Sequence, residues 1–511
     1  MSRTKNTLLN FSGNLINMFA TKILGFISRT IFIYYLDKSY LGINGLYSNL
    51  LSMLSLAELG VGTAIVYCLY KPLAEKDYEK IDILMSFYRR AYMTIGMVIA
   101  VVGTILGLFL DVLIEDITTL ENYQLYYYLF LFNTVSTYII TYKTALLSAD
   151  QKAYKVTKYN VFFQSLAQVA QILMLILTRN YTFYLLTQIL ITTIQKIYIN
   201  RFITKEYPNI TFKSKTKLGK TETDSIKKNV TAMFMQKIGG YVVFGTDNLL
   251  IARFVNLITV GIYANYTMII DIVSSFISSL FTSVAASVGN LTATDKKREY
   301  DIYKTCYLIN YLLASIASVC LYVFFNPFIS LWIGEDFTFE KRIVIVIVLN
   351  FYMTTMRRSI EIFYNANGLF WYSRYKSFIE AMINLCVSIM LAKKIGILGI
   401  LIGTSVSSIL TSVMYDAYVL FRYGFKKDIV YFMKDFVIKY VLYMMLTIFS
   451  AIICEKLTAM IGYHNFLLLI LNGLLCVIVM FILNLLCWKK SDEFQIIQRK
   501  VTDILSFIRK K

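Results

Sequence analysis

The sequence has 511 residues, of which 57% are hydrophobic and only 16% are charged, and its mean hydropathy is +0.60. A soluble protein of this length would carry far more charge. Apolar runs of about 20 residues recur along the chain, and each is long enough to cross about 30 Å of hydrocarbon as a helix. Because lipid offers no hydrogen-bond partner to the backbone, the composition predicts an all-α polytopic membrane protein.

The apolar runs predict about fourteen transmembrane helices, the eighth of which is unusually long. The predicted spans are residues 11–36, 42–70, 91–110, 123–148, 160–178, 182–200, 230–253, 258–290, 305–325, 343–366, 377–392, 397–421, 440–455 and 465–487.

The distribution of basic residues predicts the orientation. With the N-terminus inside, the predicted cytoplasmic segments hold 36 of the 51 lysines and arginines, whereas the external loop 111–122 holds none. This asymmetry is the positive-inside pattern, so both termini are expected in the cytoplasm. The net charge of +20 is then a topology signal with anionic membrane lipids as its partner, and it does not indicate nucleic acid.

Two basic cytoplasmic segments are expected to form helices at the membrane surface. Residues 71–90 end in two arginines, as helix C-termini favour. In the tail 491–511, Ser491 can cap the start of a helix whose apolar face includes Phe494 and Ile497.

An internal repeat relates the two halves of the chain. The motif G-I-x-x-x-Y occurs in "LGINGLY" (41–47) and in "VGIYANY" (260–266), and further weak matches lie at nearly the same offset. Each half contains an even number of spans, so the halves have the same orientation and are expected to be related by a pseudo-twofold axis along the membrane normal. Parallel repeats of this kind enclose a substrate site in transporters, so a transporter is the leading functional class.

The repeat predicts two six-helix lobes and an appended pair of helices. The predicted divisions are the N-lobe 1–203, a basic cytoplasmic linker 204–225, the C-lobe 226–422, two extra helices in 423–487 and a basic amphipathic tail 488–511.

Ionisable residues inside the spans are the candidate functional residues, because each costs at least about 2.5 kcal/mol in lipid. Lys22 and Arg29 are seven residues apart and share one helix face. The other central charges are Glu58, Lys237, Asp247, Asp271, Arg357, Arg358 and Glu361, and the two arginines are close enough to Glu361 in sequence to pair with it. These charges either line a water-filled cavity or pair between helices.

The charges of both signs suggest separate roles. Lys22, Arg29, Lys237, Arg357 and Arg358 are candidates for binding a phosphate, and Glu58, Asp247, Asp271 and Glu361 for coupling a cation or balancing charge. Four charges nearer the span ends are interpreted as snorkelling to the headgroups, namely Lys143, Lys196, Arg253 and Glu380.

No sequence pattern indicates a cofactor, a metal or a catalytic group. The seven cysteines form no metal-ligand spacing, and no nucleotide-binding glycine loop or nucleophile motif is present. We therefore predict that the protein is not an enzyme.

The span count, Arg29 in the first span, "YLGINGLYSNLLSMLSLAELGVGTA" and "GTDNLLIARFVNLITVGIYANYTMI" together resemble Wzx-type polysaccharide-repeat flippases. These are transporters of the multidrug/oligosaccharidyl-lipid/polysaccharide exporter superfamily. The resemblance implies movement of an undecaprenyl-pyrophosphate-linked oligosaccharide across the bacterial inner membrane, for capsule, O-antigen or other surface polysaccharide. It also implies a cationic cavity to which Lys22, Arg29 and Lys237 contribute, and it leaves a polysaccharide polymerase open as a further partner.

Three alternatives remain open at the level of sequence. A lipid II flippase would share the cationic cavity. A cation-coupled multidrug antiporter would use Glu58 and Asp271, although central cations would repel a cationic drug. A membrane-bound polysaccharide polymerase fits least, because the predicted external loops are short.

The predicted orientation can be tested by cysteine labelling in intact cells. A membrane-impermeant thiol reagent should reach a cysteine introduced at Thr118, in the predicted external loop, and should miss one introduced at Lys217, in the predicted cytoplasmic linker. The opposite labelling pattern would reverse the topology.

Overall fold

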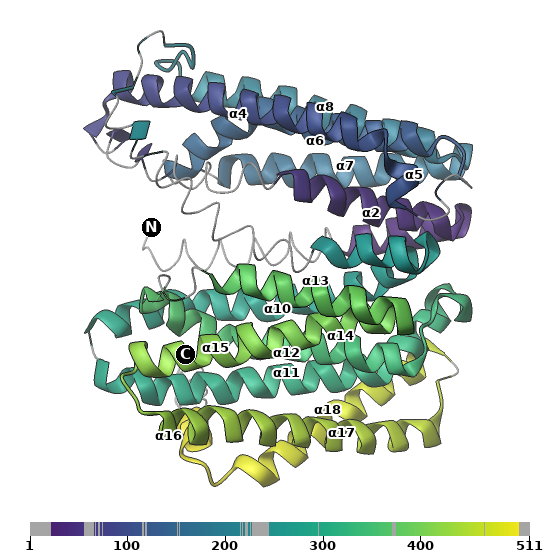
Figure 1. The fold of residues 1–511 in the computed structure, drawn as a ribbon, viewed down its shortest axis with the longest axis vertical. Coiled ribbons are helices and arrows are strands. Elements are labelled where there is room, and N and C mark those ends of the chain that lie inside the picture. The colour runs from purple at the N-terminus through teal and green to yellow at the C-terminus, as the bar shows by residue number, and fades with distance from the viewer. Residues whose placement is uncertain are drawn as a thin grey trace, which may run out of the picture. The chain divides into compact units, whose positions relative to one another are not determined.

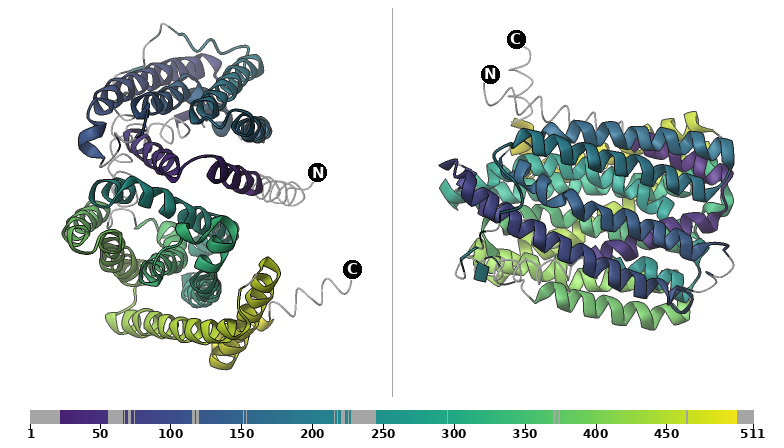
Figure 2. Two further views of the ribbon diagram at one scale, coloured as in Figure 1. Left: turned by 90° about the vertical axis from the view of Figure 1, so that its right-hand side faces the viewer. Right: turned by 90° about the horizontal axis from the view of Figure 1, so that it is seen from above.

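The computed structural model describes residues 22–499, apart from several internal gaps, and the described part is helical (Figures 1 and 2). The gaps are residues 56–65, 67, 70–71, 74, 115–116, 118–119, 151, 153, 215, 217, 220–222, 225, 227–244, 295, 370–371, 373–374 and 464.

The chain divides into two compact units, Met1–Gly261 and Ile262–Lys511. The division falls inside α10 (Leu257–Thr294), so the first turn of that helix belongs to the first unit. The labelled helices wholly inside the first unit are α2 (Lys38–Leu54), α4 (Tyr78–Gly107), α5 (Leu110–Leu113), α6 (Tyr123–Ala149), α7 (Tyr154–Thr178) and α8 (Tyr181–Glu206), to which unlabelled helices at 22–35 and 245–254 are added. The lobe boundaries proposed from the repeat stay a prediction.

The second unit continues from α10 and includes three π-helical segments. Its elements are α11 (Lys296–Ile333), the 3₁₀ turn Glu335–Phe337, α12 (Lys341–Ala366), α13 (Lys376–Ile395), α14 (Ile397–Ser408), the π-helical turn Ile409–Val413, α15 (Met414–Val419), the π-helical turn Leu420–Gly424, α16 (Ile429–Phe432), the π-helical turn Met433–Ile438, α17 (Lys439–Ile461) and α18 (Phe466–Trp488).

Eight of the described helices are long and apolar enough to cross a membrane by length and composition. They coincide with eight of the predicted spans. Helices α6, α8 and α13 also match predicted spans but are less apolar. In α6 and α8 the cause is a high content of tyrosine, threonine and glutamine, while α13 has lysines at both ends. The remaining three predicted spans lie partly outside the described residues.

Aromatic side chains and glycine fix the packing of the first unit. Helix α6 packs against α2, α4 and α8. Tyr127 of α6 is fully buried against α4, and its hydroxyl donates a hydrogen bond of 2.8 Å to the carbonyl of Gly103. A small residue on α4 lets the two backbones approach closely enough for this bond, which is how membrane helices associate when water supplies no driving force.

The glycines of the two G-I-x-x-x-Y motifs, Gly42 and Gly261, both make close backbone contacts within the first unit. A Cβ added to Gly42 would lie 2.2 Å from the carbonyl oxygen of Leu257, and one added to Gly261 would lie 2.8 Å from that of Lys38. Each glycine therefore approaches the residue four positions before the other glycine. This reciprocal contact explains why both copies of the motif have glycine at the same position.

The second unit packs around α11. Helix α11 contacts α12, α17 and α18 (Figure 1). Its tyrosines form a buried aromatic column with residues of α17; Tyr311 stacks on Tyr443 with ring centroids 3.9 Å apart. Two buried cysteines, Cys454 and Cys476, lie in the smaller core where α17 and α18 meet α11. The appended helices are thus fixed to the second unit by close packing.

The parts of the two predicted surface helices that the structure describes pack on protein, while residues 500–511 of the tail lie outside the described residues. Residues 78–90 are helical but form one continuous helix with the following span in α4, and Ile81 and Leu84 are buried. In the tail, the hydroxyl of Ser491 accepts a hydrogen bond from the Phe494 amide, which confirms the predicted cap. Phe494 and Ile497 pack against the core cluster of the second unit, so this part of the tail rests on protein.

Gly42→Val tests the reciprocal glycine contact. The new side chain must displace the backbone of Leu257, so we expect the free energy of unfolding to fall by about 3 kcal/mol, the upper end of the usual cost of overpacking. Thermal unfolding of the purified protein in detergent measures this. The control is Gly473→Val in α18, where an added Cβ meets nothing within 4 Å. Equal melting temperatures for the two variants would contradict the packing account.

Candidate functional site

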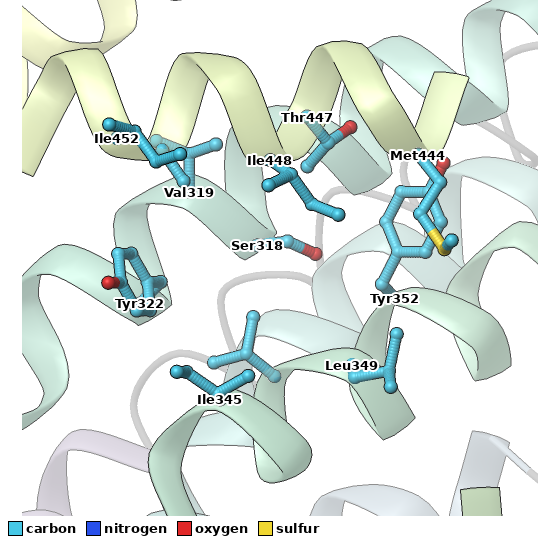
Figure 3. A pocket seen from close by; sticks show the side chains of 12 residues that line it. Ser318, Val319, Tyr322, Ile345, Leu349, Tyr352, Met444, Thr447, Ile448 and Ile452 are labelled. Carbon is cyan, nitrogen blue, oxygen red and sulfur yellow. The ribbon is translucent and has the colours of Figure 1, made fainter. Parts of the chain in front are cut away.

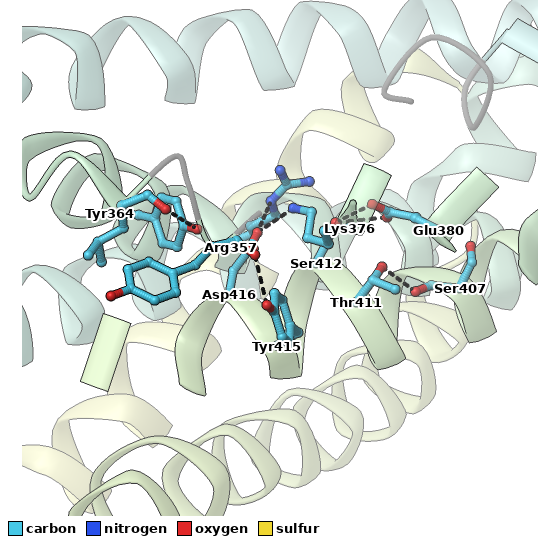
Figure 4. Close-up of polar contacts among 11 residues, drawn as sticks. Arg357, Tyr364, Lys376, Glu380, Ser407, Thr411, Ser412, Tyr415 and Asp416 are labelled. Atoms are coloured by element: carbon cyan, nitrogen blue, oxygen red, sulfur yellow. Dashed lines mark hydrogen bonds and ion pairs between the residues drawn. The ribbon is translucent and has the colours of Figure 1, made fainter. Parts of the chain in front are cut away.

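The second unit contains a charged cluster between its helices (Figure 4). We use the name polar cluster for Arg357 of α12, Lys376 and Glu380 of α13, Ser412 of the π-helical turn Ile409–Val413, and Asp416 of α15. Two cations and two carboxylates are brought together from segments that are up to 59 residues apart in the sequence.

Asp416 is the centre of the polar cluster. Its Oδ2 lies 2.6 Å from the Lys376 ammonium nitrogen and 3.7 Å from Nε of Arg357. The side chains of Lys376 and Asp416 are only 7% and 9% exposed. A pair buried this deeply loses its hydration, so each charge depends on its partner, and removing one alone is strongly destabilising.

Local helix geometry places the remaining members. Lys376 and Glu380 are one turn apart on the buried face of α13. The Ser412 hydroxyl oxygen lies 2.8 Å from both carboxylate oxygens of Glu380. Ser412 belongs to a π-helical turn, a widened turn that often marks functional positions in helices. The hydroxyl therefore holds a carboxylate that would otherwise be buried without a donor.

Arg357 keeps part of its guanidinium available. In Figure 4 its Nε is directed at Asp416 and its two terminal nitrogens point away from that carboxylate. The Arg357 side chain is 26% exposed. The Nε–Asp416 distance is that of an ion pair and too long for a hydrogen bond, and Nε is buried. The nearby carboxylate balances the charge of the guanidinium, whose planar fork suits a phosphate or carboxylate of a ligand.

A separate pocket of about 590 Å³ opens beside Lys376. Three tyrosines line it, Tyr372, Tyr375 and Tyr415, together with apolar residues of α13. The hydroxyl of Tyr415 donates a hydrogen bond of 2.8 Å to the carbonyl of Tyr372, which ties the loop before α13 to α15. The polar cluster thus has a wall of aromatic rings on one side.

The structure places Lys22 and Arg29 on one helix of the first unit, residues 22–35, where both are half-buried. Arg29 lies within electrostatic reach of Tyr184 on α8. One turn further along, Phe32 is 2% exposed and packs edge-on against Tyr181 and Tyr184. The predicted cationic face is therefore next to tyrosine hydroxyls of α8. The common cavity for all the predicted cations stays a prediction.

The other predicted site residues have different surroundings. Arg358 donates a hydrogen bond of 3.4 Å to the Ser274 carbonyl and interacts electrostatically with the exposed Glu361. Arg357 instead pairs with Asp416, and the expected pairing of Arg358 with Glu361 stays a prediction. Asp247 is buried and Asp271 is exposed. Glu58 and Lys237 lie outside the described residues.

The snorkelling interpretation was wrong for three of its four residues. Lys143 is buried and donates to the Thr204 hydroxyl at 2.7 Å. Lys196 donates to the carbonyl and side chain of Asn133 and to Ser136. Glu380 is 5% exposed and bound by Ser412. In each case an internal partner satisfies the charge, whereas Arg253 is exposed as expected.

Sequence reasoning missed Lys376 and Asp416 as site residues. Asp416 is the one acidic residue in the predicted span 397–421, which is a usable signal on its own. Lys376 directly precedes the predicted span 377–392, where a lysine is the expected flank of a span and gives no signal of a site. In the described part of the chain, no group of three histidine, cysteine, aspartate or glutamate residues could hold a metal ion.

The fold is similar to that of solved flippases and multidrug transporters. The lipid II flippase MurJ in an inward closed conformation matches with a TM-score of 0.64 and 18% identity, over 94% of this chain and 99% of that chain. An inward-facing multidrug resistance MATE family transporter of the MOP superfamily matches with a TM-score of 0.58 and 12% identity, over 79% and 95%. A MATE structure in the bent conformation matches with a TM-score of 0.54 and 11% identity, over 80% of this chain and 94% of that chain.

These similarities confirm the predicted fold class, an all-α polytopic membrane protein. No protein-family model and no curated protein matches the sequence. The structural neighbours are transporters and flippases, which agrees with the functional class that the internal repeat favours.

Asp416→Ala tests the polar cluster. It leaves Lys376 buried without its carboxylate, and we expect the free energy of unfolding to fall by about 3 kcal/mol. The double variant Lys376→Met/Asp416→Leu removes both buried charges and should recover most of that loss, since apolar replacement of a whole buried pair is often neutral. Thermal unfolding in detergent compares them. A double variant less stable than Asp416→Ala would contradict the pairing account.

Proposed function

We propose that this protein is a Wzx-type flippase of the bacterial inner membrane, with both termini in the cytoplasm. It moves an undecaprenyl-pyrophosphate-linked oligosaccharide from the inner to the outer leaflet by alternating access, for surface polysaccharide assembly. The observation that supports this most is the match to a lipid II flippase along 94% of the chain. The two multidrug transporters match over only 79% and 80% of this chain.

A largely apolar pocket beside α17, one of the two predicted extra helices, favours a lipid-linked substrate. Together α11, α12 and α17 form a pocket of about 440 Å³ (Figure 3). Its lining is largely apolar, with Val319, Ile345, Leu349 and Ile448 among the side chains. A pocket of this character accepts a hydrocarbon segment far better than a charged headgroup.

The cations of the proposed site suit a pyrophosphate. In the second unit Arg357 is 26% exposed and lies at ion-pair distance from Asp416, and in the first unit Lys22 and Arg29 lie on one helix. Arginine can grip phosphate oxygens with two parallel hydrogen bonds, while lysine contributes a point charge. In this proposal Lys237 and Arg358 add to the cationic character, and the acidic residues Glu58, Asp247, Asp271 and Glu361 balance charge or couple an ion.

A lipid II flippase is the second candidate, because the match to a structure of that activity is nearly complete for both chains. Its substrate shares the polyprenyl pyrophosphate and differs in the sugar and peptide headgroup. The two candidates can be distinguished by measuring the flipping rate of each lipid by the reconstituted protein. The Wzx-type proposal expects faster flipping of the oligosaccharide-linked lipid.

Variants of Arg29 test the phosphate-binding role in proteoliposomes that contain a fluorescent undecaprenyl-pyrophosphate-linked oligosaccharide. Loss of a charge-assisted contact of about 1.5–3 kcal/mol should slow flipping roughly 10- to 100-fold in Arg29→Ala. Arg29→Lys keeps the charge but loses the planar fork, so its rate should fall between those of wild type and Arg29→Ala. The control is Arg253→Ala, which removes an exposed arginine.

A purely structural role for Arg29 predicts a different result. If its charge only balances Asp271, removing both in Arg29→Ala/Asp271→Ala should restore flipping, because the orphaned charge then causes the damage. Full activity of this double variant would overturn the substrate-binding role of Arg29.

A further inference from the structure

A pocket of about 530 Å³ lies between α4 and residues 212–214, a segment that follows α8 and packs against α4. It is lined by Ser86, Arg89, Arg90, Met93, Thr94, Phe212, Lys213 and Ser214. We call it the basic pocket. It shares no lining residue with the polar cluster or with the cations proposed to bind the substrate, and all its lining residues belong to the first unit.

One face of α4 anchors the segment 211–214. Asp82 accepts hydrogen bonds from the Phe212 amide at 2.6 Å and from the Thr211 hydroxyl at 2.8 Å. One turn later, the Ser86 hydroxyl oxygen accepts from the Ser214 amide at 2.6 Å. Both oxygens of the one carboxylate that lies against this segment are therefore occupied by neutral donors.

Phe212 is held in an unfavourable backbone conformation. Its φ is +59°, in the left-handed region that a bulky residue rarely adopts. Its side chain is 3% exposed, its ring lies 4.5 Å from the Lys143 ammonium nitrogen, and its carbonyl accepts a bond of 3.5 Å from Arg89. A conformation of this kind persists only where several contacts enforce it, and such sites are often functional.

The basic pocket has an excess of positive charge. Arg89 and Lys213 both lie within electrostatic reach of Lys143, and Arg90 follows Arg89 on the rim. Arg90 and Lys213 are exposed, and neither has a carboxylate partner in the part of the chain that the structure describes. Three cations thus line the pocket and Lys143 lies close to two of them, while the neighbouring Asp82 carboxylate supplies a single negative charge and accepts hydrogen bonds from residues 211 and 212.

An apolar stripe continues from the basic pocket along α4. Met93, Met97 and Val101 are spaced by four residues, so they share one face, and they are 44%, 69% and 55% exposed. Arg89 and Arg90 stand immediately before the predicted start of the span at residue 91. A cationic pocket at the depth of the headgroups, above an exposed apolar stripe, matches the two chemical halves of a phospholipid.

We propose that the basic pocket binds the phosphate of an anionic phospholipid headgroup in the inner leaflet, with an acyl chain along the Met93–Val101 stripe. The lipid neutralises Arg89, Arg90 and Lys213, whose mutual repulsion otherwise opposes the docking of residues 211–214 on α4. Soluble phosphate has the same anionic chemistry but would not use the apolar stripe.

The test uses the purified full-length chain and the double variant Arg90→Gln/Lys213→Gln. Both side chains are exposed, and neither forms a hydrogen bond or ion pair through its charged group with the described residues, so the variant should fold normally. Native mass spectrometry measures retention of phosphatidylglycerol, with phosphatidylcholine as the neutral lipid. Removing two cations near an anionic headgroup should weaken phosphatidylglycerol binding roughly 30-fold. The matched control Arg201→Gln/Lys205→Gln, which removes two exposed cations of α8, should bind like wild type.

Three outcomes decide the proposal. Selective loss of phosphatidylglycerol in the pocket variant supports it. Equal retention of phosphatidylglycerol by the pocket variant and wild type overturns it. If inorganic phosphate raises the melting temperature as much as phosphatidylglycerol does, and the pocket variant abolishes both effects, the pocket is a site for soluble phosphate and the lipid is the wrong source.

Discussion

A charged or polar group inside a bilayer must find its partner within the protein, because hydrocarbon offers none. This constraint organises the described structure. Lys196 donates three hydrogen bonds to α6, and Asp416 holds Lys376 and Arg357 between three helices. The side-chain amide of Asn310 on α11 donates hydrogen bonds to backbone carbonyls of α12. These bonds act as cross-links between helices that the hydrophobic effect alone would not orient.

The same constraint separates structural charges from candidate functional ones. A cation such as Lys196, with all three donors used, has little left for a ligand. Arg357 differs, because Asp416 engages only its Nε and leaves the terminal nitrogens directed elsewhere (Figure 4). Arg90 and Lys213 differ in another way, since they lie on the rim of a pocket at the depth where headgroups are expected. We therefore look for binding positions at charged side chains in or near the membrane whose hydrogen-bond donors are only partly used by the protein.

Hydropathy predicted most of the helices because the free energy of placing a segment's side chains in lipid depends on local composition, and a backbone in lipid must be helical to satisfy its hydrogen bonds. Helices α6, α12 and α18 begin and end within two residues of the predicted spans. The reciprocal position of Gly42 and Gly261 was visible as a repeated motif before any geometry was known. The bounds of a helix depend on one segment, and a repeated motif depends on two aligned segments. Both can therefore be seen in the sequence.

Partners from distant segments could not be predicted in this way. Lys143 and Glu380 stand near span ends, where snorkelling is the default interpretation, yet Thr204 and Ser412 satisfy them inside the protein. The π-helical turn that places Ser412 has no simple residue signature. The docking of residues 211–214 depends on Asp82 and Ser86, more than 120 residues earlier.

The central claim is that the transported molecule is a lipid-linked anion, and a direct comparison of substrates tests it most simply. Unmodified protein in proteoliposomes would be offered a fluorescent undecaprenyl-pyrophosphate-linked oligosaccharide and, separately, a cationic fluorescent drug with a proton or sodium gradient. The account predicts protein-dependent flipping of the lipid-linked oligosaccharide and no transport of the drug. Gradient-driven drug transport without flipping of the lipid would contradict it.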